Sequence, residues 1–150
     1  MTSYIRSNAS FSTTLSVAAD AAWGYLTDWA GAMDWMPPDS PIGIEKIDLI
    51  GVHGQLPRTR KLFTANGIVF TETLLVQDDQ TRRIYYDYQE VRGGVLPGVR
   101  NYLATTTVDD LGGGECRMNF YSQFDLPAGT DESAMKNIMQ AVYNMIATSI

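Results

Sequence analysis

The chain has 150 residues, 45% hydrophobic and 19% charged, a composition typical of globular proteins, and we expect residues 1–150 to form one domain. The net charge of −6 disfavours nucleic acid and anionic membrane surfaces as partners, because both are bound by clustered Lys and Arg. One cysteine, Cys116, excludes an internal disulfide, and no stretch approaches the ~20 apolar residues of a membrane span. Since residues 1–8 lack the apolar run of a signal peptide, the expected location is cytoplasmic.

The first part of the chain predicts one strand followed by two short helices. In residues 10–17 apolar and polar side chains alternate, which indicates a strand with one solvated face. A short helix is expected to begin at Asp20, and a second helical turn over residues 30–35, before Pro37-Pro38. Trp29 and Trp35 lie on this irregular stretch and are too large to remain in water.

The central part of the chain reads as strands and turns. Six further strands are expected, at residues 42–49, 58–64, 68–77, 83–89, 102–108 and 116–124. Asn66-Gly67 between two of them is a strong hairpin signal. Residues 91–99 contain three glycines and Pro97, and we expect them to form a long, mobile loop.

The last segment predicts the longest helix. Thr130 is the expected N-cap, and Asp131 and Glu132 place negative charge in the first turn. Six side chains follow the spacing of one apolar helix face: Met135, Ile138, Met139, Val142, Met145 and Ile146. Three of the six are methionines, whose flexible side chains adapt to varied contacts.

This order of elements predicts an α+β fold in which a curved antiparallel sheet of about seven strands wraps around the C-terminal helix. A sheet with one solvated face must cover the other, and only one long helix is available to do so. One helix cannot fill a strongly curved sheet. An internal cavity is therefore expected.

The order of elements also resembles the helix-grip fold of the START-like (SRPBCC) superfamily, in particular its polyketide cyclase-like branch. Three strings carry the resemblance: AADAAWGYLTDW ending at Trp29, FTETLLVQDD over residues 70–79 and GVLPGVRNYLATTTVDD over residues 94–110. The resemblance implies a cavity for a hydrophobic small molecule, in a family that includes cyclases, aromatases and receptors. Fold alone does not choose among these activities.

Side-chain parity along the strands predicts the cavity wall. The expected ligand-binding residues are Trp35, Arg60, Leu62, Glu72, Leu74, Tyr86, Tyr88, Tyr102, Ala104, Phe120, Ser122, Met135, Ile138, Met139 and Val142. Counting outward from the turn, Arg60 lies directly across from Glu72. These two residues and Tyr102 are the polar candidates, as the resemblance to abscisic acid receptors also implies, although Ala104 stands where those receptors have a serine.

A structural alternative stands beside each of these assignments. Arg60 and Glu72 form either a structural ion pair or a ligand-facing pair, and the tyrosines pack either as core or as ligand contacts. His53, the only histidine, lies in a loop and is expected to be exposed. No histidine pair, cysteine cluster, phosphate loop or dinucleotide fingerprint is present in the sequence, so no metal or cofactor is expected.

Two functions remain open. The first is binding of a hydrophobic, aromatic or polyketide-like molecule. The second is a cyclase or dehydratase in which Arg60 polarises a carbonyl group while Glu72 or a tyrosine moves a proton. An arginine beside a carboxylate favours its charged form and makes it a weak base, which favours binding. The oligomeric state and the ligand's identity are left open.

Overall fold

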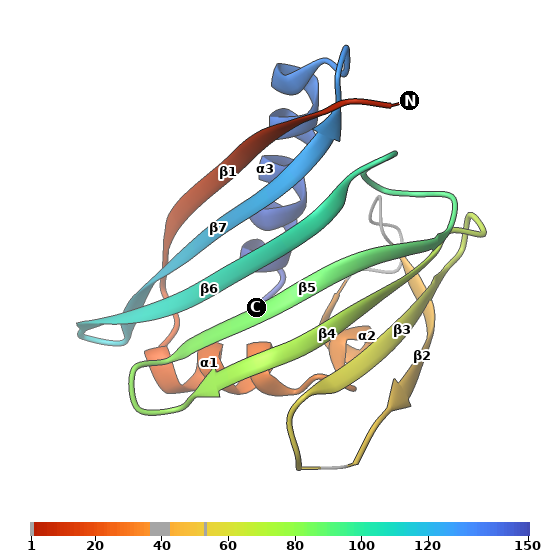
Figure 1. Ribbon diagram of the computed structural model, residues 1–150. Helices are drawn as coiled ribbons and strands as arrows, with labels where there is room; N and C mark the ends of the chain where they lie inside the picture. Colours follow the sequence, from red (N-terminus) through yellow and green to blue (C-terminus); the bar gives the residue numbers. More distant parts are fainter. Residues whose placement is uncertain (1, 37–42, 53) are drawn as a thin grey trace.

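The computed structural model describes residues 2–36, 43–52 and 54–150. These residues form a seven-stranded antiparallel sheet with the strand order β1-β7-β6-β5-β4-β3-β2. All helices lie on one side of this sheet, and the longest crosses behind β1 and β7 (Figure 1). The predicted helix-grip α+β fold, with two short helices between the first two strands, is confirmed.

The elements occur in the predicted order, and several strands are longer than predicted. The strands are β1 (Tyr4–Leu15), β2 (Ile44–Ile50), β3 (Arg58–Thr64), β4 (Val69–Asp78), β5 (Arg83–Arg92), β6 (Arg100–Gly112) and β7 (Glu115–Pro127). The helices are α1 (Ala19–Thr27), α2 (Ala32–Trp35) and α3 (Glu132–Thr148). β1 begins at Tyr4 because it pairs with β7 along its whole length, an extension that local alternation does not reveal.

Three features of the predicted chain lie outside the described residues: Pro37-Pro38, the expected strand start at Ile42, and His53. No helix in the described ranges is long and apolar enough to span a bilayer.

The hairpin of β3 and β4 has the predicted register. Arg60 pairs with Glu72 and Leu62 pairs with Phe70, on either side of the turn that contains Asn66 and Gly67. Gly67 has a φ of +84°, which a residue without a Cβ adopts readily. The turn chemistry therefore determines which side chains face each other on the inner side of the sheet.

Helix α3 differs from the prediction at its start and in its buried face. Asp131, rather than Thr130, is the N-cap, since its carboxylate accepts a 3.1 Å hydrogen bond from the Ala134 backbone N–H. The buried line of the helix consists of Met135, Met139, Tyr143 and Ala147, each one turn after the last. Ile138 is 41% exposed and lies beside this buried line. Val142 and Ile146, one and two turns later on the same side of the helix, do line the cavity.

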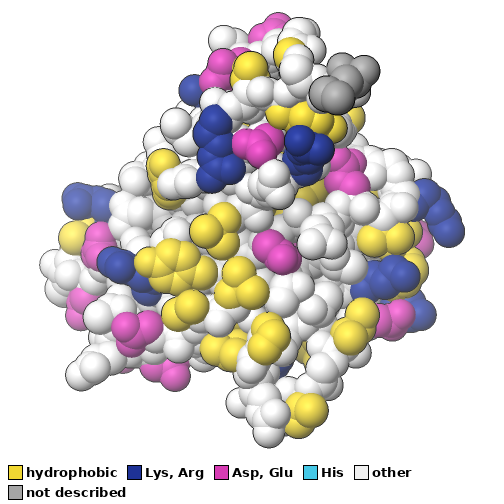
Figure 2. All heavy atoms as spheres, in the orientation of Figure 1, with side chains coloured by type: hydrophobic (Ala, Val, Ile, Leu, Met, Phe, Trp, Pro, Cys, Tyr) yellow, Lys and Arg dark blue, Asp and Glu magenta, His cyan; other side chains and the backbone are white. Residues whose placement is uncertain are grey.

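The face of the sheet opposite the helices is open to solvent. Its hydrophobic side chains are scattered among uncharged polar ones, and most Lys and Arg side chains lie toward its margins (Figure 2). The large exposed apolar residues of β6 and β7 are Leu103, Leu111 and Tyr121, with exposed fractions of 39%, 43% and 42%. The core thus lies entirely between the inner sheet face and the helices.

Candidate functional site

An internal cavity of about 90 Å³ lies between the inner face of the sheet and the helices, as the shortage of helix predicted. Most of its wall is apolar or aromatic. The lining residues are Leu26, Trp29, Trp35, Met36, Ile44, Arg60, Leu62, Phe70, Glu72, Ile84, Tyr86, Tyr88, Val95, Leu96, Tyr102, Thr106, Phe120, Met139, Val142, Tyr143 and Ile146.

Ten of the fifteen residues predicted at the cavity wall line it: Trp35, Arg60, Leu62, Glu72, Tyr86, Tyr88, Tyr102, Phe120, Met139 and Val142. The other five do not line the cavity. Leu74, Ala104, Ser122 and Met135 are buried in the packed core, and Ile138 is exposed. Side-chain parity correctly predicted which face of the sheet each strand residue lies on. It does not distinguish inward residues that line the cavity from inward residues that are packed in the core.

The sequence reasoning missed a further group of lining residues. Phe70, Ile84 and Thr106 share the parity of predicted residues, so alternation was a sufficient signal for them. Leu26, Trp29, Met36 and Ile44 lie at the ends of elements, where periodicity gives no direction. Val95 and Leu96 lie in the glycine-rich loop, and Tyr143 and Ile146 complete the α3 wall.

Arg60 and Glu72 form a charged pair at the cavity wall. Arg60 Nη2 and Nε donate to Glu72 Oε1 at 3.0 and 3.2 Å, and the side chains are only 10% and 13% exposed. Arg60 Nη1 also donates to the Trp29 carbonyl oxygen at 3.2 Å, and its guanidinium carbon lies 3.7 Å from the Trp29 ring centroid. Both donors from Arg60 use one carboxylate oxygen, and among the described residues Oε2 of Glu72 accepts no hydrogen bond.

A chain of hydroxyl groups connects the cavity wall to helix α3. The hydroxyls of Tyr102 and Tyr143 are 2.7 Å apart, and Tyr143 donates to Ser122 Oγ at 2.7 Å. Ser122 in turn lies 3.8 Å from the Met139 sulfur. Burial raises the pKa of both tyrosines, so these hydroxyls stay protonated at neutral pH and act as hydrogen-bond groups.

Three buried donors around the cavity lack a hydrogen-bond partner among the described residues: Trp29 Nε1, Trp35 Nε1 and the Tyr88 hydroxyl. The Tyr88 hydroxyl lies near the backbone N–H groups of Val95 and Leu96, which are donors themselves. Burial raises the pKa of Tyr88, so its hydroxyl keeps its proton. Buried donors are normally satisfied in native structures, so three together at one cavity mark a place for an acceptor.

Tyr102 faces the cavity because of a bulge at Asn101. Arg100 pairs with Asp125, yet Leu103 pairs with Gln123, so β6 carries one more residue than β7 here. Asn101 takes up this residue with a φ of +52°, and its side-chain amide donates to Asp125 Oδ2 at 2.8 Å. Without the extra residue, position 102 would face solvent.

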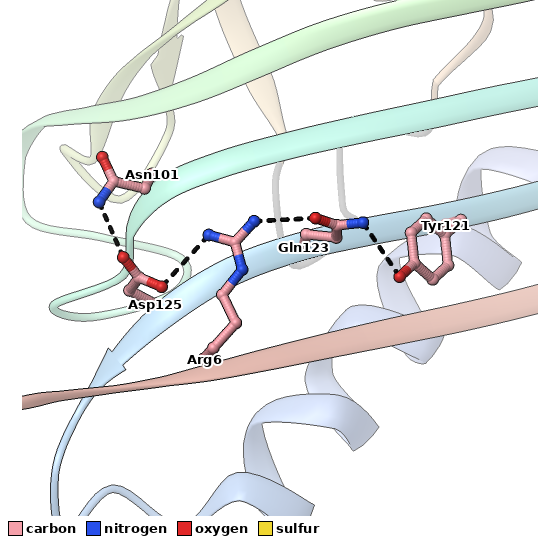
Figure 3. A network of polar contacts seen from close by, with 5 residues as sticks. All are labelled: Arg6, Asn101, Tyr121, Gln123 and Asp125. Atoms are coloured by element: carbon pink, nitrogen blue, oxygen red, sulfur yellow. Dashed lines mark hydrogen bonds and ion pairs between the residues drawn. The ribbon is translucent and has the colours of Figure 1, made fainter.

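The Asp125 carboxylate that holds Asn101 belongs to a network on the outer face of the sheet (Figure 3). Arg6 donates to Asp125 Oδ1 at 3.2 Å and to Gln123 Oε1 at 2.8 Å. The hydrogen bond from Asn101, followed by those from Arg6, lowers the pKa of Asp125. The bulge is thus fixed by a charge-assisted network formed by β1, β6 and β7.

The glycine-rich loop starts at Gly93, two residues later than predicted, and covers one side of the cavity. Val95 and Leu96 line the cavity, and Leu96 and Val99 are buried. The Glu90 carboxylate lies directly against Gly94, so a side chain at position 94 would displace it. This loop therefore packs onto the cavity in the structure, and its mobility stays a prediction.

The model of the family described as polyketide cyclase / dehydrase and lipid transport matches residues 7–148. The chain belongs to this family. The resemblance stated from the sequence is confirmed, and no curated protein matches the sequence.

Several solved structures have the same fold as this protein, although their sequence identity to it is low. A protein of Bacillus thuringiensis aligns with a TM-score of 0.73 and 18% identity, covering 95% of this chain and 98% of that one. Norcoclaurine synthase from Thalictrum flavum, in complex with a transition state analogue, gives 0.69 and 19%, covering 97% and 94%. The Zhui aromatase/cyclase from Streptomyces sp. R1128 gives 0.69 and 18%, covering 97% and 88%.

Proposed function

We propose that this protein binds an aromatic, polyketide-like small molecule whose oxygen atoms accept hydrogen bonds inside the cavity. The observation that carries this proposal is a set of buried donors that have no partner in the described part of the chain: the two indole N–H groups of Trp29 and Trp35 and the Tyr88 hydroxyl. An apolar ligand without acceptors would leave all three unsatisfied. A carbonyl or ether oxygen supplies what each lacks, at a net gain of about 1 kcal/mol per bond.

The family description supports a ligand of this kind. Members are described as cyclases and dehydrases of polyketides and as lipid transporters, and polyketides carry carbonyl oxygens on a carbon skeleton. Tyr86, Tyr88, Tyr102 and Phe120 surround the cavity with rings suited to planar molecules. The few polar groups among them would orient the ligand, as in most small-molecule sites.

A cyclase or dehydratase activity is the second candidate, favoured by the free oxygen of Glu72. Because Arg60 uses only Oε1, Oε2 is left to accept a proton or a hydrogen bond from a bound molecule. Arg60 would stabilise the negative charge that develops on a substrate carbonyl. The mechanism requires the substrate carbon acid to lie within hydrogen-bond reach of Oε2.

Native mass spectrometry of the protein from its source organism tests the binding proposal. We expect a bound molecule to co-purify with the wild-type protein and its occupancy to fall in Trp35→Phe, which removes one donor and keeps an aromatic ring. Equal occupancy in both proteins, or no bound molecule, would contradict the proposal. Turnover of an added polyketone that is lost in Glu72→Gln would establish the second candidate instead.

A further inference from the structure

A second hollow, of about 300 Å³, adjoins the cavity at the far edge of the sheet. It lies between the connection from α1 to α2 and the adjacent ends of β2 and β3. We call it the outer cleft. Its lining residues include Asp28, Ala30, Leu49, Ile50 and Arg58.

Trp29 separates the outer cleft from the cavity. It is the single residue that lines both hollows, among those described. Trp29 is 4% exposed, and its indole contacts the Arg60 guanidinium and packs edge-on with the Tyr86 ring at a centroid distance of 5.8 Å. It sits in the short irregular connection between α1 and α2, outside any regular element.

An aromatic ligand with several rings needs more room than the cavity offers. An engineered cavity of roughly 150 Å³ holds a single benzene ring, whereas this one measures about 90 Å³. A single ring therefore fits only if the side chains that line the cavity shift slightly, and a molecule with two or more rings does not fit while Trp29 stays in place. The two hollows joined enter the range of about 300–1,000 Å³ that is usual for small-molecule sites.

The outer cleft carries its own unsatisfied polar group. Arg58 Nε is buried without a partner among residues 2–36, 43–52 and 54–150, and Nη2 donates to Gln77 Oε1 at 3.2 Å. Among the described residues Arg58 forms no ion pair, and the nearby Asp28 carboxylate lies against Gly31. Around Arg58, Leu49 and Ile50 expose 53% and 54% of their surface, which gives the cleft an apolar rim.

We infer that Trp29 is a movable partition and that the cavity and the outer cleft together form one site for an aromatic molecule bearing an anionic group. This inference rests on the proposed function and extends it. The rings occupy the cavity and the space vacated by Trp29, and the anionic oxygen pairs with Arg58 in the outer cleft. Arg60, which stacks on Trp29 and binds its carbonyl oxygen, holds the partition closed in the absence of ligand.

Two dyes with the same ring system and different charges test the inference. N-phenyl-1-naphthylamine and 8-anilinonaphthalene-1-sulfonate share the same rings, and only the second carries an anion. Their binding is measured by fluorescence titration, with acetophenone as a one-ring probe of the inner cavity. Arg58→Gln should weaken the sulfonate dye at least tenfold and leave the neutral dye within twofold, and Arg58→Lys should restore part of the difference.

A second variant tests the inference independently if Arg58→Gln does not fold. Ala30 is exposed in the outer cleft, so Ala30→Trp fills the cleft without disturbing the core. We expect it to weaken both dyes at least tenfold and to leave acetophenone binding unchanged. Ala141→Trp, at an exposed site on α3 outside both hollows, is the matched control and should change neither.

The outcomes separate the two proposals. If acetophenone binds while Ala30→Trp leaves both dyes unaffected, the outer cleft is not part of the site and the inference is overturned. Equal loss of the two dyes in Arg58→Gln would overturn the assignment of the anion to Arg58. If acetophenone and both dyes fail to bind the wild-type protein, the proposed function itself falls.

Discussion

The guanidinium carbon of Arg60 lies 3.7 Å from the centre of the Trp29 indole ring, and the same side chain donates to the Trp29 carbonyl oxygen at 3.2 Å. Arg60 therefore links the inner sheet face to the connection between two helices. Its charge is balanced by Glu72 across the hairpin. Arg60 thus forms an ion pair and also lines the cavity, and its ligand-facing role stays a prediction.

A double-mutant cycle on Arg60 and Glu72 measures the structural role. Because both side chains are nearly buried, Glu72→Gln and Arg60→Met should each lower the free energy of unfolding by about 3 kcal/mol, and the double variant should recover much of the loss. The exposed pair Lys46–Asp48, 3.3 Å apart, is the control and should show almost no coupling. Single losses of about 1 kcal/mol without coupling would show that cavity water solvates both groups, which leaves only a ligand-facing role.

The hydroxyl chain predicts an order of effects between its two tyrosines. Tyr143→Phe removes the middle hydroxyl and leaves both Tyr102 and Ser122 without their partner, at a cost of about 1–3 kcal/mol in urea unfolding. Tyr102→Phe removes an end of the chain and should cost less. Equal costs for the two variants would mean that the hydroxyls are not joined as the structure has them.

Asn101 predicts a difference between two small replacements. Its φ of +52° is unfavourable for residues with a Cβ, so Asn101→Ala should be less stable than Asn101→Gly by about 1 kcal/mol or more. Both lose the hydrogen bond to Asp125, which makes the glycine variant the matched control. Weaker binding of aromatic probes by the alanine variant alone would show that the bulge positions Tyr102. Equal stability of the two variants would contradict the left-handed backbone at Asn101.

Glu90 predicts a dependence of stability on pH. Burial raises its pKa above the ordinary 4.5, so the folded state binds this proton more tightly than the unfolded state does. The stability it contributes is complete below pH 4.5 and is lost as pH rises through the raised pKa. Protection factors of the amides in residues 93–99, which correct for the intrinsic rise of exchange with pH, should therefore fall over that window in the wild-type protein and stay constant in Glu90→Gln. Exposed Glu115→Gln is the control and should behave as the wild type.

Local rules predicted the inner face of the sheet and its central hairpin. The Arg60–Glu72 pairing followed from one turn signal, and strand alternation placed Tyr86, Tyr88 and Tyr102 inward. Tyr102 was assigned correctly only because the predicted strand began there, beyond the bulge at Asn101. Counted from Arg100 without the bulge, its parity would have been reversed.

Tertiary packing decided what the sequence did not reveal. Trp29 lies in an irregular connection, so nothing local indicates that it lies between two hollows. Tyr143 joins the buried line of α3 because the helix packs mainly on β1 and β7, which turns Met135 and Met139 toward the sheet. The predicted face, centred nearer Ile138 and Val142, was rotated relative to this line.

The central claim, that the cavity selects aromatic molecules bearing an acceptor oxygen, is tested most directly by the indole N–H signals in a ¹H–¹⁵N NMR spectrum. Acetophenone and cumene are of nearly the same size, and cumene carries a methyl group where acetophenone has its carbonyl oxygen. The indole of Trp23 already donates to Asp79 at 3.0 Å and serves as the internal control.

We predict that acetophenone binds about tenfold more tightly than cumene, the value of about one hydrogen bond, and shifts the signal of Trp29 or Trp35 downfield while that of Trp23 stays in place. Equal affinity for the two molecules, with no shift of the Trp29 and Trp35 signals, would contradict the claim.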